Sequence, residues 1–348
     1  MDKQSKATTV REVKGWLHKV CIIPGRLDGK LVIITGANTG IGETTTGEIA
    51  RRGATVIMAC RDFKRAQGAR ERLLNQYGVN NPDSLKKNVA DPRVATSVSC
   101  ISEDQVIMCF SSGFNLLQLQ IELLDLSSLN SVRQFAARIR ERYEKLDYLI
   151  NNAGLLKQTH SITEDGLETT VGVNHLGPFL LTQLLLPLMH TAEASCSSRI
   201  IFVSSMLHKF GELSKPSLHI PPERYTIMSA YCQSKLANVM CAKELASRLE
   251  GTGIVVVSLH PGAVKTEIAR DITGGPERIG HFLFQPFLID PWLGCQTTLY
   301  TVLAPVVKSG AYYDNCKEAS PKSIVFNQKE RKWLWKISCE LVGLNPNE

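Results

Sequence analysis

The sequence predicts an α/β fold, in which a Rossmann-type, doubly wound parallel sheet forms a single domain with an irregular insertion. Two observations support this. Short apolar runs rich in β-branched residues alternate with helix-like segments, which is the pattern of a parallel sheet with helices on both faces. The first run also passes straight into a glycine-rich turn and a helix, as nucleotide-binding sheets do. With 348 residues, 43% of them hydrophobic, the chain is long enough for one large or two small domains.

Six strands and the helices between them can be assigned along the chain. We expect strands at residues 31–35, 54–60, 116–124, 147–151, 199–205 and 253–260. Helices are expected at 42–52, 63–77 and 228–249. Another helix should begin at a cap formed by Ser127 or Ser128 and end near residue 143. A further long helix should contain residues 173–175 and end near residue 190. An amphipathic stretch lies near 333–342. Residues 1–28 are expected to form an N-terminal extension and residues 29–348 the domain.

The alternation of strands and helices is interrupted at residues 80–115. These residues contain Pro82, Pro92 and a serine-rich tract, without a sustained apolar period. Connections this long are uncommon in compact α/β domains, and a segment that cannot bury an apolar face cannot offset its ordering entropy. We therefore expect an insertion at about 83–113 that is mobile, lies at the surface and contributes no catalytic residue.

Composition limits the classes of partner and compartment. The formal net charge is +7, but the basic residues are scattered, which argues against nucleic-acid binding and is compatible with an anionic cofactor or a membrane surface. The ten cysteines include no C-x-x-C pair and the eight histidines show no metal-binding spacing, so we expect free thiols, a reducing compartment and no metal site. The chain lacks a run of about 18 apolar residues and a signal-peptide core. We expect an intracellular protein, cytosolic or held peripherally at a membrane, without a transmembrane helix.

The glycine-rich turn predicts a phosphate-binding site. It reads Gly36-Ala-Asn-Thr-Gly40-Ile-Gly42, with the spacing G-x-x-x-G-x-G. Glycines so placed let the backbone turn sharply and approach a pyrophosphate, whose charge the N-terminus of the following helix favours. A glycine turn can also be purely structural, but the strand before it and the helix after it favour phosphate binding.

The end of the second strand bears on the choice of nucleotide. In NAD-binding sheets an acidic residue near this point holds the ribose 2′-hydroxyl, whereas an arginine accommodates a 2′-phosphate. Here the strand ends at Cys60 and is followed by Arg61, whose guanidinium pairs well with phosphate. The sequence therefore favours NADP(H). Asp62 is the competing carboxylate, and a solvated loop charge is the alternative for Arg61.

Tyr231 and Lys235 are the candidates for proton transfer. Four residues apart, their phenol and ammonium lie on one face of a helix, one turn from each other. The reference pKa of tyrosine is near 10, and bringing it to about 7 requires roughly 4 kcal/mol of bias toward the phenolate. One cation at about 4 Å supplies such a bias at an effective dielectric near 20. The same spacing recurs at Tyr313 and Lys317, so an ordinary exposed pair is the alternative.

Several short motifs occur in a fixed order between about residues 27 and 270. They are Thr35-Gly-Ala-Asn-Thr-Gly-Ile-Gly42, Ala59-Cys-Arg-Asp62, Leu124-Asp-Leu-Ser127, Asn151-Asn-Ala-Gly154, Gly172-Val-Asn-His-Leu-Gly177, Ser204-Ser205, Tyr231-Cys-Gln-Ser-Lys-Leu-Ala237 and His260-Pro-Gly262. Jointly they resemble the short-chain dehydrogenase/reductase family and, within it, the retinol dehydrogenase-like group of the 11 to 14 type. Together they are far more specific than any one of them.

The resemblance implies a role for each matching residue. Tyr231 would be the general acid and base, Lys235 would hold the nicotinamide ribose and lower the pKa of the phenol, Ser205 would hydrogen-bond the substrate oxygen, and Asn174 would orient a proton relay. The cofactor NADP(H) would be bound by Gly36, Asn38, Thr39, Gly40, Ile41 and Gly42 near the pyrophosphate, Arg61 at the 2′-phosphate, Asp125 on the adenine side, Asn152 beside the ribose, and Thr266 at the carboxamide. Hydrogen bonding at the sheet edge is the alternative for Asn152, and a helix cap is the alternative for Thr266.

The implied activity is hydride transfer between NADP(H) and an apolar alcohol or carbonyl compound, with retinol and retinal as substrates and residues 265–348 as a substrate cover. The alternatives are a broader carbonyl or steroid reductase and a nucleotide-sensing binding protein without turnover. The presence of Asn174, Ser205, Tyr231 and Lys235 together argues against the binding protein, because a pure binder needs no poised phenol. A homodimer and peripheral contact with the endoplasmic reticulum membrane are left open.

Four features depart from the pattern of that group. Glu43 stands where relatives often carry Lys, which weakens the NADP(H) prediction, and Pro178 stands where the group usually has His, which puts the local helix start in doubt. The hydrophobic N-terminal anchor of many relatives is missing. The insertion at about 83–113 is foreign to the family.

Overall fold

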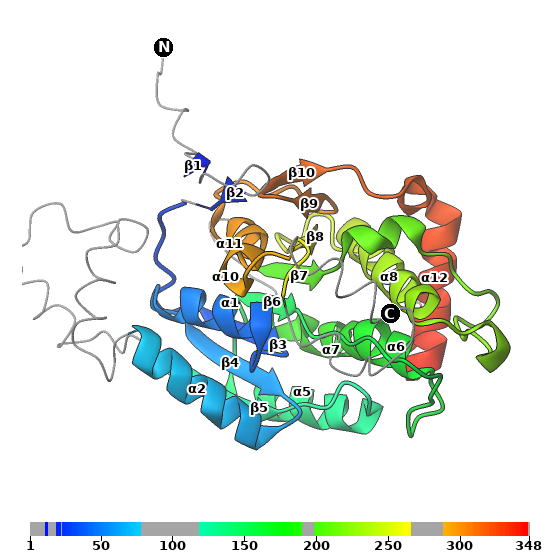
Figure 1. The fold of residues 1–348 in the computed structure, drawn as a ribbon, viewed down its shortest axis with the longest axis horizontal. Coiled ribbons are helices and arrows are strands. Elements are labelled where there is room, and N and C mark those ends of the chain that lie inside the picture. The colour runs from blue at the N-terminus through cyan, green and yellow to red at the C-terminus, as the bar shows by residue number, and fades with distance from the viewer. Residues whose placement is uncertain are drawn as a thin grey trace, which may run out of the picture.

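The computed structural model describes residues 11–12, 19–21, 23–77, 118–189, 198–265 and 288–346. In these ranges an eight-stranded sheet lies between two layers of helices (Figure 1). The strand order is β10-β9-β8-β7-β6-β3-β4-β5. The strands are β3 (Leu31–Thr35), β4 (Thr55–Cys60), β5 (Gln118–Leu123), β6 (Tyr148–Asn151), β7 (Arg199–Val203), β8 (Val255–His260), β9 (Tyr312–Asp314) and β10 (Lys317–Ala319). The α/β class, the doubly wound topology and all six expected strands are therefore confirmed.

Two strands at one edge of the sheet were not expected from the sequence. Strand β9 pairs in parallel with β8, and β10 returns antiparallel to β9 through a tight turn. Asn315 and Cys316 adopt positive φ angles of 50° and 58° in this turn. Each strand is three residues long, which is too short to establish an alternating pattern. A further pair, β1 (Arg11–Glu12) and β2 (Lys19–Val20), forms a separate two-stranded sheet.

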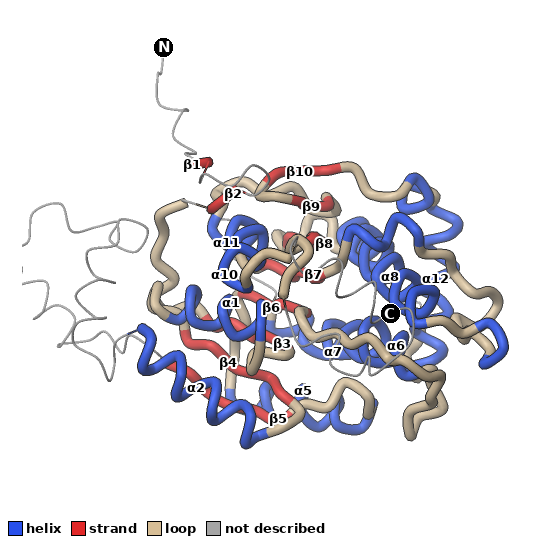
Figure 2. Tube along the Cα trace, viewed as in Figure 1, coloured by secondary structure: helices blue, strands red, loops and turns tan. Residues whose placement is uncertain are grey.

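Alternate residues of the strands face two separate hydrophobic cores. Ile33, Leu149 and Ile200 pack with α5 (Leu129–Arg142), α7 (Gly177–Leu185) and α8 (Ile227–Arg248). Their neighbours Val32, Ile150 and Ile201 pack on the other face with α1 (Gly40–Ala50), α2 (Phe63–Tyr77) and α11 (Gln296–Leu303). Figure 2 shows these helices on the two sides of the strands. A parallel sheet buried on both faces explains why its strands read as continuous apolar runs.

The expected helices are present, and two of the caps can be identified. The Ser128 hydroxyl accepts a hydrogen bond from the Ser131 N–H at 3.2 Å and caps α5. Thr226 and Ser229 form a reciprocal capping box at the start of α8, the 22-residue helix that carries Tyr231 and Lys235. Such caps satisfy backbone N–H groups that lack a partner within the helix.

The helix that contains Asn174 is a composite. It begins as α6 (Thr169–Val171), widens into a π-helical turn at Gly172–Leu176, continues as α7 and ends in a 3₁₀ turn at Leu186–Leu188. Pro178 is the second residue of α7 and sits in its first turn, which a proline tolerates. Thr169–Leu188 is also the only helix in the described ranges that is long and apolar enough to cross a membrane, and 78% of its apolar window is buried inside the domain. That burial is typical of a core helix.

The C-terminal helix belongs to the same core. Helix α12 (Gln328–Val342) runs beside α8, on the far side of the domain from α2 (Figure 1). The Trp335 ring meets Phe179 of α7 edge to face, with 5.0 Å between centroids, and the Arg248 guanidinium lies 4.3 Å from the same ring. Of the expected substrate cover, residues 266–287 lie outside the described residues. The rest of it supplies strands β9 and β10 and helices to the domain.

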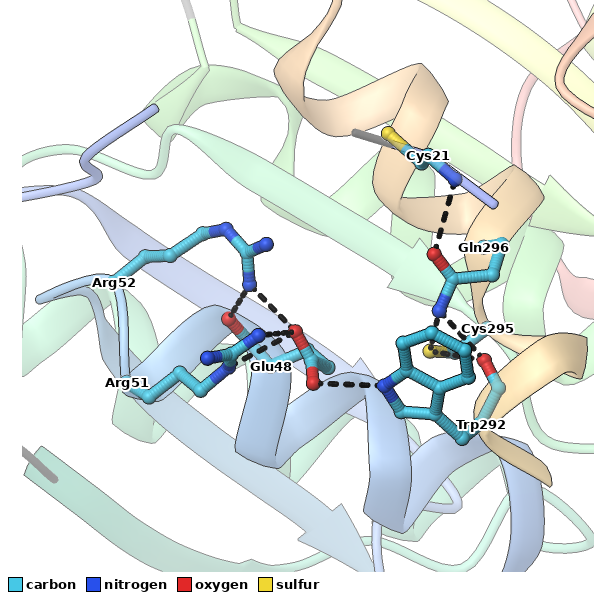
Figure 3. Close-up of polar contacts among 7 residues, drawn as sticks. All are labelled: Cys21, Glu48, Arg51, Arg52, Trp292, Cys295 and Gln296. Carbon is cyan, nitrogen blue, oxygen red and sulfur yellow. Dashed lines mark hydrogen bonds and ion pairs between the residues drawn. The ribbon is translucent and has the colours of Figure 1, made fainter. Parts of the chain in front are cut away.

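A buried ionic cluster fixes α1, the helix that follows the glycine turn. The Glu48 carboxylate accepts hydrogen bonds from Arg51 Nη2 at 2.6 Å, Arg52 Nη1 at 2.7 Å and Trp292 Nε1 at 3.1 Å (Figure 3). Trp292 lies on α10 (Pro291–Gly294). Burial alone would raise the pKa of Glu48, but the two guanidinium groups bring it below its ordinary value. The cluster joins α1 to a segment 244 positions further along the chain.

The structure describes part of the expected N-terminal extension but not the expected insertion. The Cys21 N–H donates to Gln296 Oε1 at 3.1 Å (Figure 3), and Ile23 and Leu27 are buried in the core beside α1 and α11. The end of the expected extension therefore packs onto the domain. The expected insertion at 83–113 lies outside the described residues. The seven cysteines in the described ranges are free, as predicted, and all are buried.

Candidate active site

A cleft at the carboxyl ends of the parallel strands brings most of the predicted site residues together. Its volume is about 340 Å³, which is within the range of small-molecule sites. Carboxyl ends of strands at the point where the strand order reverses are the usual ligand site of such sheets, and here that point lies between β3 and β6. The predicted residues that line the cleft are Gly36, Asn38, Thr39, Ile41, Gly42, Arg61, Asp125, Asn152, Tyr231 and Lys235. Thr266 lies outside the described residues.

The glycine turn needs glycine for reasons of backbone shape and space. Gly36 and Gly40 have φ angles of 65° and 54°, in the left-handed region that favours glycine. A Cβ on Gly42 would collide with the Gly36 carbonyl oxygen and lie 2.5 Å from Asn152 Nδ2. Thr39, the residue at the N-cap of α1, makes no side-chain capping bond. The first N–H groups of this 11-residue helix therefore start at the cleft, where they suit an anion.

Asn152 holds the turn against the sheet. Its side-chain Nδ2 donates to the Thr35 carbonyl at 2.9 Å, and its backbone N–H donates to Thr35 Oγ1 at 3.0 Å. The structure thus places Asn152 in the sheet-edge hydrogen bonding that was the alternative to a ribose contact. Asn152 also lines the cleft.

Two arginines face the cleft at the end of β4. Arg61 lines it as predicted, and Arg65, one helical turn further along, lines it as well. The competing carboxylate, Asp62, lines the cleft too, and its Oδ1 accepts the Arg65 backbone N–H at 3.0 Å and so caps α2. Arg65 was not predicted from the sequence, although its i,i+4 spacing from Arg61 indicates that the two side chains share a face.

Glu43 does not face this cleft. Its carboxylate pairs with the Arg72 guanidinium of α2 through bonds of 2.8 Å and 2.7 Å. This pair joins the outer surfaces of α1 and α2. The presence of a carboxylate here, in place of the Lys that relatives often carry, therefore adds no negative charge to the lining of the cleft.

Asp125 is fixed by the turn that it forms. Its Oδ1 accepts hydrogen bonds from the Ser127 N–H at 2.9 Å and the Ser127 hydroxyl at 2.6 Å. Its own N–H donates to Ser131 Oγ at 3.0 Å. Asp125 and Ser127 both line the cleft, so this end of the site carries one oriented carboxylate.

Tyr231 is buried and hydrogen-bonded to Ser205. Burial raises the pKa of Tyr231 to about 12, and the bond to Ser205 opposes part of that rise. We had expected Lys235 to lower the pKa of this phenol. In the structure the pKa of Tyr231 is set mainly by burial, which raises it, and only in part by the bond to Ser205, so the effect of Lys235 stays a prediction.

Lys235 lies one turn from Tyr231 on the same face of α8. Its Nζ donates to the Val203 carbonyl at 3.0 Å and lies 5.5 Å from the Tyr231 ring centroid. Burial lowers the pKa of Lys235 to about 8. A Cβ on Gly154 would lie 3.2 Å from Nζ, so a small residue after β6 leaves space beside the ammonium.

The two serines after β7 have separate functions. Ser205 reaches Tyr231, whereas the Ser204 hydroxyl donates to the Lys235 carbonyl at 2.8 Å and holds α8. The Ser205 carbonyl accepts hydrogen bonds from the backbone N–H of His208 at 3.1 Å and from the ring Nδ1 of His208 at 2.7 Å. His208 Nε2 accepts the Lys322 N–H at 3.2 Å, which fixes one neutral tautomer. His208 could not be predicted from the sequence, because its partner Lys322 is distant in the chain.

Asn174 is held within the π-helical turn, behind the cleft lining. Its Oδ1 accepts the Leu155 N–H at 2.8 Å, and its Nδ2 donates to the Leu155 carbonyl and to Ser234 Oγ, both at 3.0 Å. A Cβ on Gly154 would lie 3.5 Å from Oδ1 and 3.2 Å from Lys235 Nζ. Asn174 and Lys235 therefore approach the same point. Turns of this kind occur often at functional sites.

Comparison with known proteins identifies close relatives in sequence. A family model described as short chain dehydrogenase matches residues 117–276. Retinol dehydrogenase 14 of Mus musculus is 39% identical over 330 residues, which cover 92% of this chain and 88% of the relative. Retinol dehydrogenase 12 of Homo sapiens is 38% identical over 327 residues, which cover 93% of this chain and 90% of the relative. Retinol dehydrogenase 13 of Homo sapiens is 37% identical over 331 residues, which cover 93% of this chain and 88% of the relative.

Solved structures share the fold. The crystal structure of an uncharacterised protein from Mycobacterium paratuberculosis has a TM-score of 0.67 and 28% identity, with coverage of 92% of this chain and 96% of that one. The Pseudomonas aeruginosa RhlG/NADP active-site complex has a TM-score of 0.57 and 23% identity, with coverage of 83% and 95%. At that identity the likeness supports the fold alone.

Proposed function

Because the chain belongs to the short-chain dehydrogenase/reductase family, in its retinol dehydrogenase-like group, we propose that it is an NADP(H)-dependent oxidoreductase that interconverts an apolar alcohol and its carbonyl compound. Retinol and retinal are the substrates we propose. The observation that carries this proposal is that Tyr231, which is hydrogen-bonded to Ser205, and Lys235 line the same cleft as the glycine turn.

The chain's own residues fit a dinucleotide. A side chain at Gly42 would collide with the turn, and the start of α1 faces the same space. Gly36, Gly40 and Gly42 would hold the pyrophosphate, and Lys235 would hold the ribose next to the nicotinamide. NADP(H), when bound, would supply or accept the hydride.

Two cations support the choice of NADP(H) over NAD(H). Arg61 and Arg65 line the end of the cleft next to β4, while Asp62 is engaged as the cap of α2. A 2′-phosphate pairs well with guanidinium groups. One oxygen of the carboxylate that would favour a free 2′-hydroxyl thus already accepts a backbone N–H.

Proton transfer would run through Tyr231. In the direction of reduction the phenol donates its proton to the carbonyl oxygen, while Ser205 hydrogen-bonds the same oxygen and fixes its position. In the direction of oxidation the phenolate accepts the proton of the alcohol. The nearby lining of Leu155, Val173 and Val203 is apolar, which suits an apolar substrate and slows exchange with water.

A screen of the purified protein tests the proposal. Loss of reduced nicotinamide absorbance would be followed with NADPH and, in turn, retinal, an aliphatic aldehyde and a ketosteroid. We expect the highest kcat/KM with retinal. A preference for the ketosteroid or the aliphatic aldehyde would support the broader carbonyl or steroid reductase. Tight NADPH binding without turnover of any of them would support the nucleotide-sensing alternative.

A further inference from the structure

A buried histidine that the proposed mechanism does not use, His175, adjoins Asn174. It is 0% exposed, and three helical segments meet at its ring. Its Nδ1 lies 3.3 Å from Oδ1 of Asn238 on α8, and its Nε2 lies 2.9 Å from Oγ of Ser338 on α12. A polar ring with both nitrogens engaged in the core specifies one arrangement of its neighbours.

The direction of every hydrogen bond in this chain of contacts can be assigned. Asn238 Nδ2 lies 2.9 Å from the Asn174 carbonyl oxygen, which can only accept, so the amide nitrogen must face it. The other end of the amide, Oδ1, is then an acceptor, and His175 must carry its proton on Nδ1. His175 Nε2 is left as the acceptor, so the Ser338 hydroxyl donates to it.

A proline explains why the Asn174 carbonyl takes a side-chain donor. In an α-helix this carbonyl would accept the N–H of the residue four positions later. That residue is Pro178, which has no N–H. Pro178 therefore cannot supply the α-helical donor to this carbonyl, and the amide of Asn238 supplies one from the side. Burial lowers the pKa of His175 to about 4, so the imidazole stays neutral and the assigned directions hold at neutral pH.

We propose that His175 and Asn238 are positioning residues for the reaction, which act by holding the backbone of Asn174 and, through it, the surroundings of Lys235. The proposal rests on the proposed function. The Asn174 side chain is clamped to Leu155 and approaches the space next to Lys235. A shift of the π-helical turn would therefore move the groups that surround the ammonium. Ser338 extends the same support to α12.

Steady-state kinetics of matched variants test this role. His175→Phe keeps a ring but removes both nitrogens, and Asn238→Asp turns an oxygen toward the Asn174 carbonyl. We expect both to lower kcat with retinal about tenfold or more, because small displacements of reacting groups are costly, while the Kd for NADPH changes less than about threefold. His175→Asn, which offers an amide N–H near the position of Nδ1, should restore much of the loss. Thr301→Val removes an equally buried hydroxyl on α11 and should leave kcat unchanged.

A second measurement does not depend on activity. In protein labelled with ¹⁵N-histidine, the signal that is lost in His175→Asn should show a protonated Nδ1 and an unprotonated Nε2 throughout the neutral range. A proton on Nε2, or titration near the ordinary pKa of histidine, would overturn the assigned network. Unchanged kcat in His175→Phe and Asn238→Asp, with an active parent protein, would overturn the positioning role alone. A parent protein that turns over no carbonyl substrate would refute the proposed function and this role with it.

Discussion

The ammonium nitrogen of Lys235 lies 5.5 Å from the centroid of the Tyr231 ring, and both side chains are buried. Burial raises the pKa of Tyr231 to about 12 and lowers that of Lys235 to about 8. As the pH rises, the ammonium therefore loses its proton before the phenol does. At neutral pH the pair is a cation beside a neutral phenol, which is ready to donate a proton to a carbonyl oxygen.

This relationship predicts different pH dependences for the two directions of the reaction. Reduction needs the protonated phenol, which persists below its raised pKa, so kcat/KM for retinal should vary little between about pH 6 and 8. Oxidation needs the phenolate, so kcat/KM for retinol should increase with pH, by up to about tenfold per unit. Initial rates in buffers of constant ionic strength would measure both profiles. Oxidation that is fastest below neutral pH would contradict the assignment.

Removing the phenolic hydroxyl should separate binding from chemistry. Tyr231→Phe takes away the proton donor but leaves the glycine turn and both arginines in place. We expect kcat to fall by about 10²–10⁴-fold, with NADPH binding, followed by fluorescence, nearly intact. Tyr313→Phe is the control, because Tyr313 has a lysine four positions later but lies on β9 and accepts a hydrogen bond from the Lys308 N–H. Its activity should match that of the parent protein.

The parts of the site that could be predicted from the sequence are local. The glycine turn is a contiguous motif between a strand and a helix, and Tyr231 and Lys235 are related by one helical turn. The pair Tyr313 and Lys317 shows the limit of such spacing, because these residues lie on two strands. Only the neighbouring motifs distinguish the pair Tyr231 and Lys235 from the pair Tyr313 and Lys317.

What the sequence could not predict depends on contacts between distant residues. His208 meets Lys322, and His175 meets Ser338, more than a hundred positions away in each case. The extent to which Tyr231 is buried, which raises the pKa of its phenol, could not be predicted either, because spacing along a helix does not reveal burial. The hydrogen bonds of Asn152 to Thr35 also join residues more than a hundred positions apart, and its contact with a ribose stays a prediction.

Arg61 and Arg65 should together set the cofactor preference. Charge-assisted hydrogen bonds contribute about 1.5–3 kcal/mol each, so Arg61→Ala and Arg65→Ala should each raise the KM for NADPH roughly tenfold or more and leave the KM for NADH nearly unchanged. Arg72→Ala is the matched control on α2, because Arg72 pairs with Glu43 on the outer surface. Equal kcat/KM for NADPH and NADH in the parent protein would refute the proposed preference.

The buried carboxylate of Glu48 should stabilise the fold far more than the surface carboxylate of Glu43, although both lie on α1. Glu48→Gln leaves Arg51 and Arg52, which are 2% and 1% exposed, without their counter-charge. Such a loss costs about 3–5 kcal/mol of unfolding free energy. Glu43→Gln breaks a pair in which the Arg72 side chain is 58% exposed. We therefore expect it to lower the unfolding free energy by only about 0–1 kcal/mol.

Urea unfolding of the two glutamine variants and the parent protein as a function of pH would measure this difference. The folded-state pKa of Glu48 is lowered below 4.5, so its stabilisation is present above the unfolded-state pKa and is lost as the pH falls through the folded-state value. The difference in unfolding free energy between the parent protein and Glu48→Gln should therefore be largest at neutral pH and become smaller in acid. Equal stability of the two variants at neutral pH would mean that the arginines find other partners when the carboxylate is removed. The anchoring of α1 to Trp292 would then not depend on the charge of Glu48.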